Sequence, residues 1–224
     1  AGITHWVVEN AKSARAFLKR VNAVQALACS LQDMHIAELP RAAHKKGDHG
    51  QAGDTAAAQA LLAPLLQGHN MGLLSEAGMP AVADPGSSIV RAAHALGVRV
   101  LPLVGPSSIF LALAASGLNG QQFAFIGYLP QQAPERNARI KQLETQALKS
   151  GQAQLCIETP YRNAALWQAL LAVLQPSTML ALHSGLTLER SFSRSLSVAA
   201  WRKLGATPQV QAALALPCIF AFGQ

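Results

Sequence analysis

The chain has 224 residues, half of them hydrophobic, so it can build a large core in one or two domains. Its formal net charge of +7 admits nucleic acid or an anionic small molecule as a partner, but charged residues make up only 13% and the basic ones are scattered in pairs. No apolar run reaches the about 18 residues of a membrane span, and the first residues do not resemble a signal peptide. We therefore expect a cytoplasmic protein with no membrane partner.

The cysteines and histidines indicate no disulfide framework and no metal site. The three cysteines are far apart and lack CxxC spacing, so we expect them to be buried as small apolar residues. A polar stretch at residues 35–50 carries histidines and an aspartate whose spacing matches no HExxH or comparable ligand pattern. We predict a loop there and no metal. The residues concerned are Cys29, Cys156, Cys218, His35, His44, Asp48 and His49.

The first elements expected along the chain are a strand and the helix that follows it. Residues 5–9 form a short apolar strand, and a helix is expected over residues 11–21. Glu9 is either functional, because it lies at the end of a strand, or an exposed or capping residue. Another strand with its connection is expected within residues 24–39, followed by a helix over residues 56–68.

Residues 71–130 contain a repeated pattern of strand, loop and helix. Short apolar strands are expected at residues 72–74 and 98–104, and each leads into a turn of small residues, SEAGMP or GPSS, that opens a helix. In open α/β sheets, ligands bind beyond the carboxyl ends of strands, where loop amides and helix N-termini meet. Gly78 and Gly105 would let the backbone approach a ligand closely, although ordinary turns of an α/β domain use the same residues.

The second half of the chain continues the alternation of strands and helices, which predicts the α/β fold class. The most economical architecture has two α/β domains with a cleft between them, and a single larger sheet is the alternative. We expect an N-terminal domain at residues 1–122, a linker at 123–132 and a C-terminal domain at 133–224. Later strands are expected at residues 123–128, 154–158, 178–184, 194–196 and 217–222, and later helices at 135–149, 162–174 and 198–204.

The catalytic constellations that short motifs reveal are missing. The sequence has no GxSxG elbow, no Walker A pattern, no GxGxxG fingerprint and no cysteine nucleophile with a local signature. Without an evident nucleophile or metal, we expect a reaction in which positioning does most of the work. Methyl transfer from a sulfonium donor is compatible with this, because the leaving group is already activated.

Five motifs follow one another along the chain: VEN (8–10), SEAGMP with DPG (75–86), VGPSS (104–108), FIGYLP (125–130) and ETPYR (158–162). They resemble, in this order, the motifs A-E-D, S-D-A-G-x-P…D-P-G, P-G-P-x-x, F-x-G-F-L-P and Y-E-S-x-x-R. Through them the chain is similar to the tetrapyrrole-methylase superfamily of S-adenosylmethionine-dependent methyltransferases, in particular to its bacterial small-subunit ribosomal RNA 2′-O-methyltransferase branch. The similarity covers residues 5–222.

The resemblance implies a two-domain α/β enzyme, typically a homodimer. Such an enzyme binds S-adenosylmethionine in the cleft between its domains and releases S-adenosylhomocysteine. Arg162, at the arginine position of its motif, would hold the acceptor or a phosphate, and a surface salt bridge is the other interpretation of this residue. The cofactor contacts that the resemblance implies are Ala77, Gly78, Ser107, Ser108, Leu182, His183, Pro217, Cys218 and Ile219.

The departures from the family pattern concern the methyl acceptor. Where the ribosomal RNA enzymes have A-R-E-L-T-K, this chain reads HSGLTL at residues 183–188, so three charges suited to RNA are missing. The acceptor stays open between an RNA ribose 2′-hydroxyl and a small anionic molecule such as a tetrapyrrole. The contrasting hypothesis is a non-catalytic ligand- or RNA-binding protein that retains the fold. The family's first strand and loop, P-T-P-I-G-N, have no counterpart ahead of Ala1, so we expect either a piece of a longer chain or weakened cofactor binding.

Overall fold

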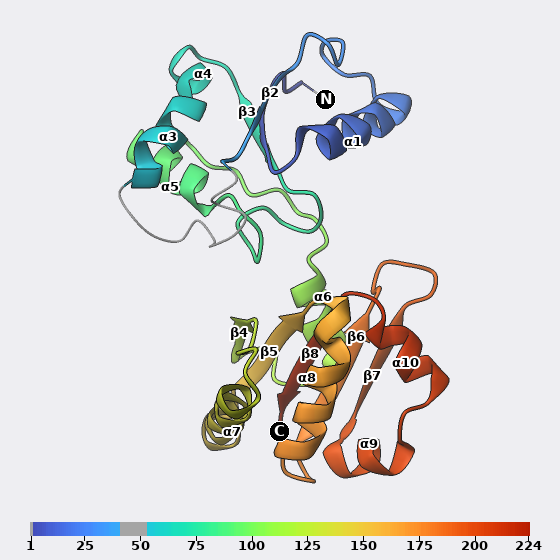
Figure 1. The fold of residues 1–224 in the computed structure, drawn as a ribbon. Coiled ribbons are helices and arrows are strands. Elements are labelled where there is room, and N and C mark those ends of the chain that lie inside the picture. The colour runs from blue at the N-terminus through green and yellow to red at the C-terminus, as the bar shows by residue number, and fades with distance from the viewer. Residues whose placement is uncertain (1, 41–52) are drawn as a thin grey trace. The chain divides into compact units, whose positions relative to one another are not determined.

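The computed structural model describes residues 2–40 and 53–224, and the chain divides into two compact units, Ala1–Pro106 and Ser107–Gln224. Each unit has its own β-sheet and its own helices (Figure 1). The α/β fold class predicted from the sequence is therefore confirmed. The alternative of a single larger sheet is wrong for the described residues, because their strands fall into two sheets.

The first unit contains a three-stranded sheet in which both strand pairs are parallel. β1 (His5–Val8) lies in the centre, between β2 (His35–Glu38) and β3 (Met71–Leu74). Val7 and Val8 of the central strand are fully buried, as expected for a parallel strand that is covered on both faces. The strand predicted at the start of the chain is confirmed.

The helices of the first unit begin and end where their sequence dictates. The Asn10 side chain caps the first helix by accepting hydrogen bonds from the backbone N–H groups of Lys12 (2.9 Å) and Ser13 (3.1 Å). Pro64 lies in the first turn of a separate short helix, where its missing N–H costs no helical hydrogen bond. The helices are α1 (Ala11–Val24), α3 (Gly53–Leu61), α4 (Ala63–Leu66) and α5 (Ser87–Ala95).

The strand predicted at residues 98–104 is absent. These residues have no regular secondary structure, although Val98 and Val100 still pack on the core of the first unit. Leu101 and Leu103 are exposed. The prediction was wrong because an apolar run becomes a strand only where a neighbour completes its hydrogen bonds, and no strand of the described residues pairs with this one.

The second unit contains a five-stranded mixed sheet with the order β4-β5-β8-β6-β7. β4 and β5 are parallel, whereas β8 runs antiparallel to both of its neighbours and β7 runs antiparallel to β6. The strands are β4 (Phe123–Gly127), β5 (Ala153–Glu158), β6 (Met179–Ser184), β7 (Phe192–Ser197) and β8 (Cys218–Gly223). All five strands predicted for this half are present, with ends that differ by one or two residues.

Alternation along the strands divides the second core into two layers. Leu180, Leu182, Phe220 and Phe222 point to one face and pack with side chains of four helices, whereas another helix, α6, packs across β6, β7 and β8 (Figure 1). The helices of this unit are α6 (Ser108–Ser116), α7 (Ala133–Ser150), α8 (Pro160–Val173), α9 (Val198–Leu204) and α10 (Pro208–Leu214), of which α10 was not predicted.

The division between the units differs from the one expected at residues 123–132. The structure divides after Pro106, so that α6 belongs to the second unit and not to a domain spanning residues 1–122. The physical reason is the apolar character of α6, whose Ile109, Ala112 and Leu113 are buried in this unit. A helix as apolar as α6 packs against the face of the second unit's sheet that the other helices leave uncovered.

Candidate active site

The loop after β3 in the first unit is tied to the end of β1. The backbone N–H of Glu9 donates to the carbonyl of Leu74 (3.1 Å), and the backbone N–H of Glu76 donates to the Glu9 carboxylate (2.9 Å). The Ser75 hydroxyl donates to the carbonyl of Ala77 (3.0 Å) and is largely buried. Glu9 therefore does more than the exposed or capping residue considered from the sequence, because its carboxylate organises the loop that holds Ala77 and Gly78.

The backbone of this loop takes up conformations that side chains disfavour. Gly78 has a φ of 71°, and two alanines, Ala81 and Ala83, also have positive φ values of 65° and 63°. A left-handed conformation costs a residue with a side chain roughly 1–2 kcal/mol. Strain of this kind is commonly found at ligand-binding loops, and the exposed Ala77 and Gly78 lie at the surface of this one.

Asp84, in the same loop, has a perturbed carboxyl group. Desolvation, together with the negative charges of Glu9 and Glu76, raises its pKa from 3.8 to about 6. Three acidic side chains therefore surround the turn at Gly78. A group of this kind favours a positively charged ligand next to it over a negatively charged one.

In the second unit, the strand register brings three separate segments together at one end of the sheet, where strands begin or finish. Glu158 at the end of β5 pairs with Cys218 at the start of β8, and Cys218 pairs with Ser184 at the end of β6. We call this the Cys218 edge; in Figure 1 it is the end of the sheet away from the label C. Of the predicted site residues, Leu182, His183, Pro217, Cys218 and Ile219 lie at this edge or within two residues of it, and Arg162 follows Glu158 in the first turn of α8.

Arg162 is held by the carboxylate of Glu158. Its Nε donates to Glu158 Oε1 (2.9 Å) and a terminal nitrogen of the guanidinium lies 2.7 Å from the same oxygen. That oxygen also accepts hydrogen bonds from the backbone N–H and hydroxyl of Thr159. The salt-bridge interpretation of Arg162 is thus what the structure contains, although the bridge leaves the guanidinium partly exposed at the Cys218 edge.

His183 is a buried, neutral imidazole. Burial lowers its pKa to about 4, and its Nδ1 lies 2.9 Å from the Ser193 hydroxyl on β7. Its Nε2 has no hydrogen-bond partner among the residues that the structure describes. A buried imidazole nitrogen without a partner is unfavourable, so Nε2 of His183 is available to form a hydrogen bond with a water molecule or a ligand.

Ser107 and Ser108 begin α6. Ser107 is buried and takes the position before the helix, but its hydroxyl makes no capping hydrogen bond, whereas Ser108 is exposed. The other end of the helix is close to the opposite edge of the sheet, since Leu118 lies near Gly223 at the end of β8. The two serines therefore lie toward the Cys218 edge.

Cys218 and Cys156 are packing residues. Burial raises the pKa of each thiol to about 12, so neither is a thiolate at neutral pH, and both are buried as the sequence predicted. Cys29 is only partly buried. Leu182 packs in the core, while Pro217 is exposed and Ile219 is buried.

The structure thus separates the predicted cofactor residues into two groups. Ala77 and Gly78 lie in the loop after β3 of the first unit, and the remaining residues lie at or toward the Cys218 edge of the second. Their roles in binding stay predictions. Sequence reasoning did not find Asp84 or the contact of Glu9 with the loop, because both depend on the pairing of β1 with β3.

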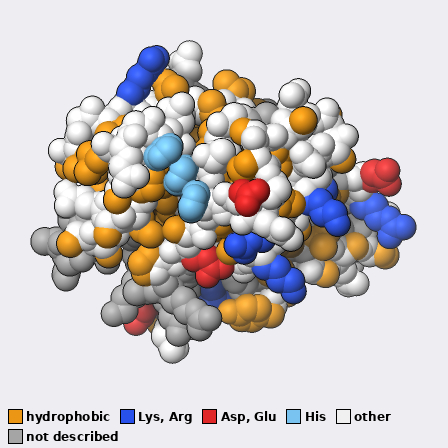
Figure 2. Space-filling model, turned by 90° about the horizontal axis from the view of Figure 1, so that it is seen from above, with side chains coloured by type: hydrophobic (Ala, Val, Ile, Leu, Met, Phe, Trp, Pro, Cys, Tyr) orange, Lys and Arg blue, Asp and Glu red, His pale blue; other side chains and the backbone are white. Residues whose placement is uncertain are grey.

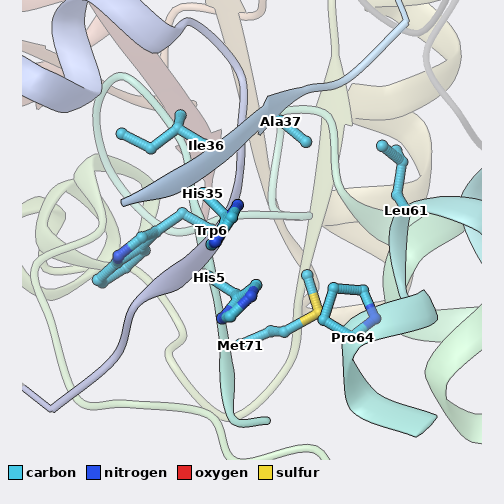
Figure 3. Close-up of a pocket in the computed structure, with 8 residues that line it drawn as sticks. All are labelled: His5, Trp6, His35, Ile36, Ala37, Leu61, Pro64 and Met71. Atoms are coloured by element: carbon cyan, nitrogen blue, oxygen red, sulfur yellow. The ribbon is translucent and has the colours of Figure 1, made fainter. Parts of the chain in front are cut away.

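A second feature of the first unit is a stack of three histidines at the amino ends of its strands. The ring of His5 lies between those of His35 and His69, with centroids 4.5 Å apart on each side. Figure 2 shows three histidine side chains in a row at the surface. His5 and His35 border a small pocket, whose volume is about 240 Å³ and whose wall includes Trp6 and Met71 (Figure 3).

The histidine stack does not form a metal site. Nearly parallel rings direct their nitrogen lone pairs along separate planes, and no group of three or more potential ligands that could hold a metal ion occurs among residues 2–40 and 53–224. His44, Asp48 and His49 of the polar stretch lie outside the described residues.

In the described part of the chain, no helix combines the length and the apolar character needed to cross a bilayer.

Comparison with known proteins gives a family match and several similar proteins. A family model described as Tetrapyrrole (Corrin/Porphyrin) Methylases matches residues 10–197. Proteins named ribosomal RNA small subunit methyltransferase I are 41% identical over 95 residues (Xylella fastidiosa), 35% over 130 residues (Escherichia coli O157:H7) and 38% over 133 residues (Mesorhizobium japonicum). These matches cover 42%, 58% and 59% of this chain and 34%, 44% and 42% of the relatives, so less than half of each relative is matched.

Two solved structures have a similar fold. The methyltransferase CobJ aligns with a TM-score of 0.52 and 15% identity, over 100% of this chain and 95% of CobJ. The cobalamin biosynthetic enzyme cobalt precorrin-4 methyltransferase aligns with a TM-score of 0.52 and 10% identity, over 99% of this chain and 84% of the enzyme. At these identities the likeness concerns the fold alone.

Proposed function

The chain belongs to the tetrapyrrole methylase family, and on this basis we propose that it is an S-adenosylmethionine-dependent methyltransferase whose acceptor is a ribose 2′-hydroxyl of RNA. The observation that carries the proposal is the 35–41% identity with ribosomal RNA small subunit methyltransferases of three bacteria. The tetrapyrrole enzymes share the fold at 10–15% identity, which carries no statement about the acceptor.

The loop after β3 has the properties that the cofactor requires. S-adenosylmethionine supplies a methyl group on a positively charged sulfonium and also carries an ammonium group. Glu9, Glu76 and Asp84 place negative charge around the turn at Gly78, and the charges of Glu9 and Glu76 add to the desolvation that raises the pKa of Asp84. The exposed backbone of Ala77 and Gly78 is available for close contact, since Gly78 has no side chain and a left-handed conformation.

The second unit contributes neutral groups in this proposal. Ser107 and His183 are buried polar residues toward the Cys218 edge, and the Nε2 atom of His183 lacks a protein partner in the described part of the chain. Its pKa of about 4 keeps the imidazole uncharged at physiological pH, so it can donate or accept a hydrogen bond without repelling a cationic ligand. These residues would orient the bound molecules, because positioning supplies most of the rate in a transfer from an activated donor.

Arg162 is the acceptor-side residue of this proposal. Its guanidinium is anchored by Glu158 and partly exposed, which suits a group that contacts a phosphate of RNA in one orientation. The segment at residues 183–188 lacks the charges of the ribosomal RNA enzymes, so fewer electrostatic contacts hold the acceptor here. An RNA acceptor would place the enzyme in the cytoplasm, and a homodimer is the assembly that the family resemblance implies.

The experiment that tests the function has two stages. The chain is first titrated calorimetrically with S-adenosylmethionine and S-adenosylhomocysteine, and saturable binding near one cofactor per chain is expected. It is then incubated with small ribosomal subunits and cofactor carrying a tritiated methyl group. A 2′-O-methyl product protects the neighbouring phosphodiester from alkaline cleavage, so the label is expected in an alkali-resistant dinucleotide.

Each result decides between the hypotheses. Labelled, alkali-resistant RNA supports the proposal. Cofactor binding without transfer to ribosomal RNA or tetrapyrroles would favour the non-catalytic protein that retains the fold. A folded chain with no cofactor binding at millimolar concentration would overturn the methyltransferase proposal.

A further inference from the structure

The large apolar side chains that the second unit exposes are concentrated at one end of its sheet. Four of them lie in the segments at the Cys218 edge, and the other two exposed large apolar residues of this unit, Phe110 and Leu111, lie on α6. Both tyrosines of the chain are among the four. The residues at the edge, with their exposed fractions, are Tyr128 (57%), Tyr161 (81%), Leu188 (59%) and Leu216 (36%).

The strand topology explains why these residues come together. Tyr128 directly follows β4, which runs parallel to β5, so it lies at the end where Glu158 finishes β5. Tyr161 follows Glu158 in the first turn of α8. Leu188 belongs to the loop after β6 and Leu216 to the segment before β8. The last residue of β6, Ser184, pairs with the first residue of β8, Cys218, so both segments start from this edge.

The segment around Tyr161 is fixed by hydrogen bonds and not only by packing. The buried Asn163 donates from Nδ2 to the carbonyls of Leu214 (3.0 Å) and Leu216 (2.7 Å), which attaches the start of α8 to the segment before β8. Arg162, held by Glu158, places the carbon of its guanidinium 5.3 Å from the centroid of the Tyr161 ring. The backbone that carries Tyr161 is therefore fixed, and most of the tyrosine's surface remains accessible to solvent.

We propose that the Cys218 edge binds the RNA acceptor as a single strand, with unpaired bases stacked on Tyr161 and Tyr128 and the neighbouring backbone held by Arg162. This inference rests on the proposed function, because it takes RNA as the acceptor. Exposed aromatic rings and arginine guanidinium planes are the surfaces on which unpaired bases stack. Bases in a duplex have both faces covered, so the edge selects single-stranded segments and loops.

The edge carries little net charge, so stacking is the property that supports RNA as its occupant. Arg162 and the exposed Arg190 lie in segments of this edge beside Glu158 and the exposed Glu189, while the chain as a whole carries a formal charge of +7. Stacking is also tolerant of sequence, since every base has a π-face. The edge therefore supplies affinity for an unpaired strand, while the atom that is methylated is selected by the cofactor site.

The test compares the binding of short fluorescent RNAs by anisotropy. One RNA is an unstructured single strand and the other is a duplex of the same sequence. Tyr161→Leu keeps an apolar side chain but removes the ring, and we expect it to weaken single-strand binding by about 5- to 100-fold. Tyr161→Phe keeps the ring and is expected to bind like the parent chain.

Phe17 offers a matched control on α1 of the first unit. Its ring is 43% exposed and also has an arginine over it, with Arg20 Cζ 5.6 Å from the centroid. Phe17→Leu repeats the aromatic-to-leucine change in a segment that is not part of the Cys218 edge, and unchanged RNA binding is expected. Equal loss in Phe17→Leu and Tyr161→Leu would overturn the proposal, because the effect would then be general.

The outcomes separate this inference from the proposed function. If Tyr161→Leu binds RNA like the parent chain while cofactor binding and methyl transfer persist, the edge is not the acceptor surface and the function stands. A parent chain that prefers the duplex would also overturn the inference. If RNA binding depends on Tyr161 but no cofactor binds, the inference stands and the methyltransferase proposal fails.

Discussion

The carboxylate of Glu9 accepts a hydrogen bond from the backbone N–H of Glu76 at 2.9 Å, and this bond joins the end of β1 to the loop after β3. The same carboxylate contributes to the raised pKa of Asp84, behind desolvation in size. Glu9 and Glu76 follow β1 and β3, which are neighbours in a parallel sheet. The loop that carries Ala77 and Gly78 is therefore organised by a distant part of the chain.

Removing the charge of Glu9 is expected to lower the pKa of Asp84. The folded state raises this pKa from 3.8 to about 6, so protonated Asp84 stabilises the folded state below pH 4, and this stabilisation is lost as the pH rises from about 4 to about 6. Glu9→Gln keeps an acceptor for the Glu76 N–H but removes one like charge. The Asp84 carboxyl carbon, followed by NMR, should titrate at lower pH in Glu9→Gln.

Glu38→Gln is the control for this titration. Glu38 is another carboxylate of the first unit, which accepts a hydrogen bond from the backbone N–H of Ala11 at 2.6 Å and does not contribute to the Asp84 shift. We expect its variant to leave the Asp84 midpoint in place. An unchanged midpoint in Glu9→Gln would show that the charge of Glu9 does not raise the pKa, which would leave desolvation and Glu76 as its causes.

Gly78→Val is expected to abolish cofactor binding. An added Cβ would meet only Asp84 Oδ2 at 3.8 Å, so the protein leaves room for it, but the φ of 71° is strained for valine and the side chain would occupy the ligand's side of the loop. The strain costs roughly 1–3 kcal/mol of stability. Calorimetric titration with S-adenosylmethionine measures the loss of affinity.

Gly97→Val separates loss of the site from loss of stability. Gly97, just after α5, has a φ of 69° and open space around its Cβ position, so its variant carries a similar strain in the same unit. Both variants should unfold at lower urea concentration, and only Gly78→Val should lose cofactor binding. Equal affinity of the two variants would remove Gly78 from the binding site.

Much of the fold could be predicted because its signals are local. The apolar runs that became β1, β5, β6 and β8 and the helical patterns between them are visible within short windows. Residues 98–104 show the limit of this approach, since the apolar run there has no strand partner among the described residues. α10 was missed although Thr207 and Pro208 mark its start, with the Thr207 hydroxyl accepting from the Val210 N–H.

The candidate site was harder to predict because its contacts join distant segments. The ion pair of Arg162 with Glu158 is an exception, because the two residues are four apart in the sequence. The contact of Glu9 with Glu76 and the histidine stack depend on the pairing of β1 with β3 and with β2. These contacts have no local sequence signal.

The cysteines predict a simple pattern of chemical labelling. Burial raises the pKa values of Cys156 and Cys218 to about 12 and also blocks access, whereas Cys29 is only partly buried. Iodoacetamide at mildly alkaline pH should therefore modify Cys29 in the native chain and all three cysteines in denaturant, as read by peptide mass spectrometry. Rapid native labelling of Cys218 would contradict the packing of β8.

The histidine stack predicts that the first unit loses stability in mild acid. Desolvation lowers the pKa of His5 from 6.5, and the neighbouring His35 and His69 lower it further. The unfolded state therefore binds a proton more readily, so the stability linked to His5 is present above pH 6.5 and is lost as the pH falls from there through the lowered pKa of the folded state. Urea unfolding at a series of pH values measures it.

Two substitutions distinguish the stack from histidines in general. His69→Asn removes one outer ring and one source of repulsion, so the His5 ring should titrate closer to 6.5 by NMR. His94→Asn removes an exposed histidine in the last turn of α5, outside the stack, and should leave the His5 midpoint unchanged. A His5 midpoint at 6.5 in the parent chain would refute the stacked, neutral arrangement.

Arg162 has a structural partner and a proposed ligand, and three variants separate the two roles. Arg162→Ala leaves the nearly buried Glu158 carboxylate with only its Thr159 donors, so we expect a loss of about 1–2 kcal/mol in the free energy of unfolding. This is less than for a fully buried pair because the arginine is partly exposed.

Glu158→Gln releases the guanidinium of Arg162 but keeps its charge at the Cys218 edge. If Arg162 contacts the acceptor phosphate, Glu158→Gln should keep much of the methyl transfer that Arg162→Ala loses, with the loss seen as a raised KM for RNA. Arg139→Ala, at a partly exposed position of α7, is the control and should change neither stability nor KM appreciably. Equal activity of Arg162→Ala and the parent chain would leave the salt bridge as the whole role of this residue.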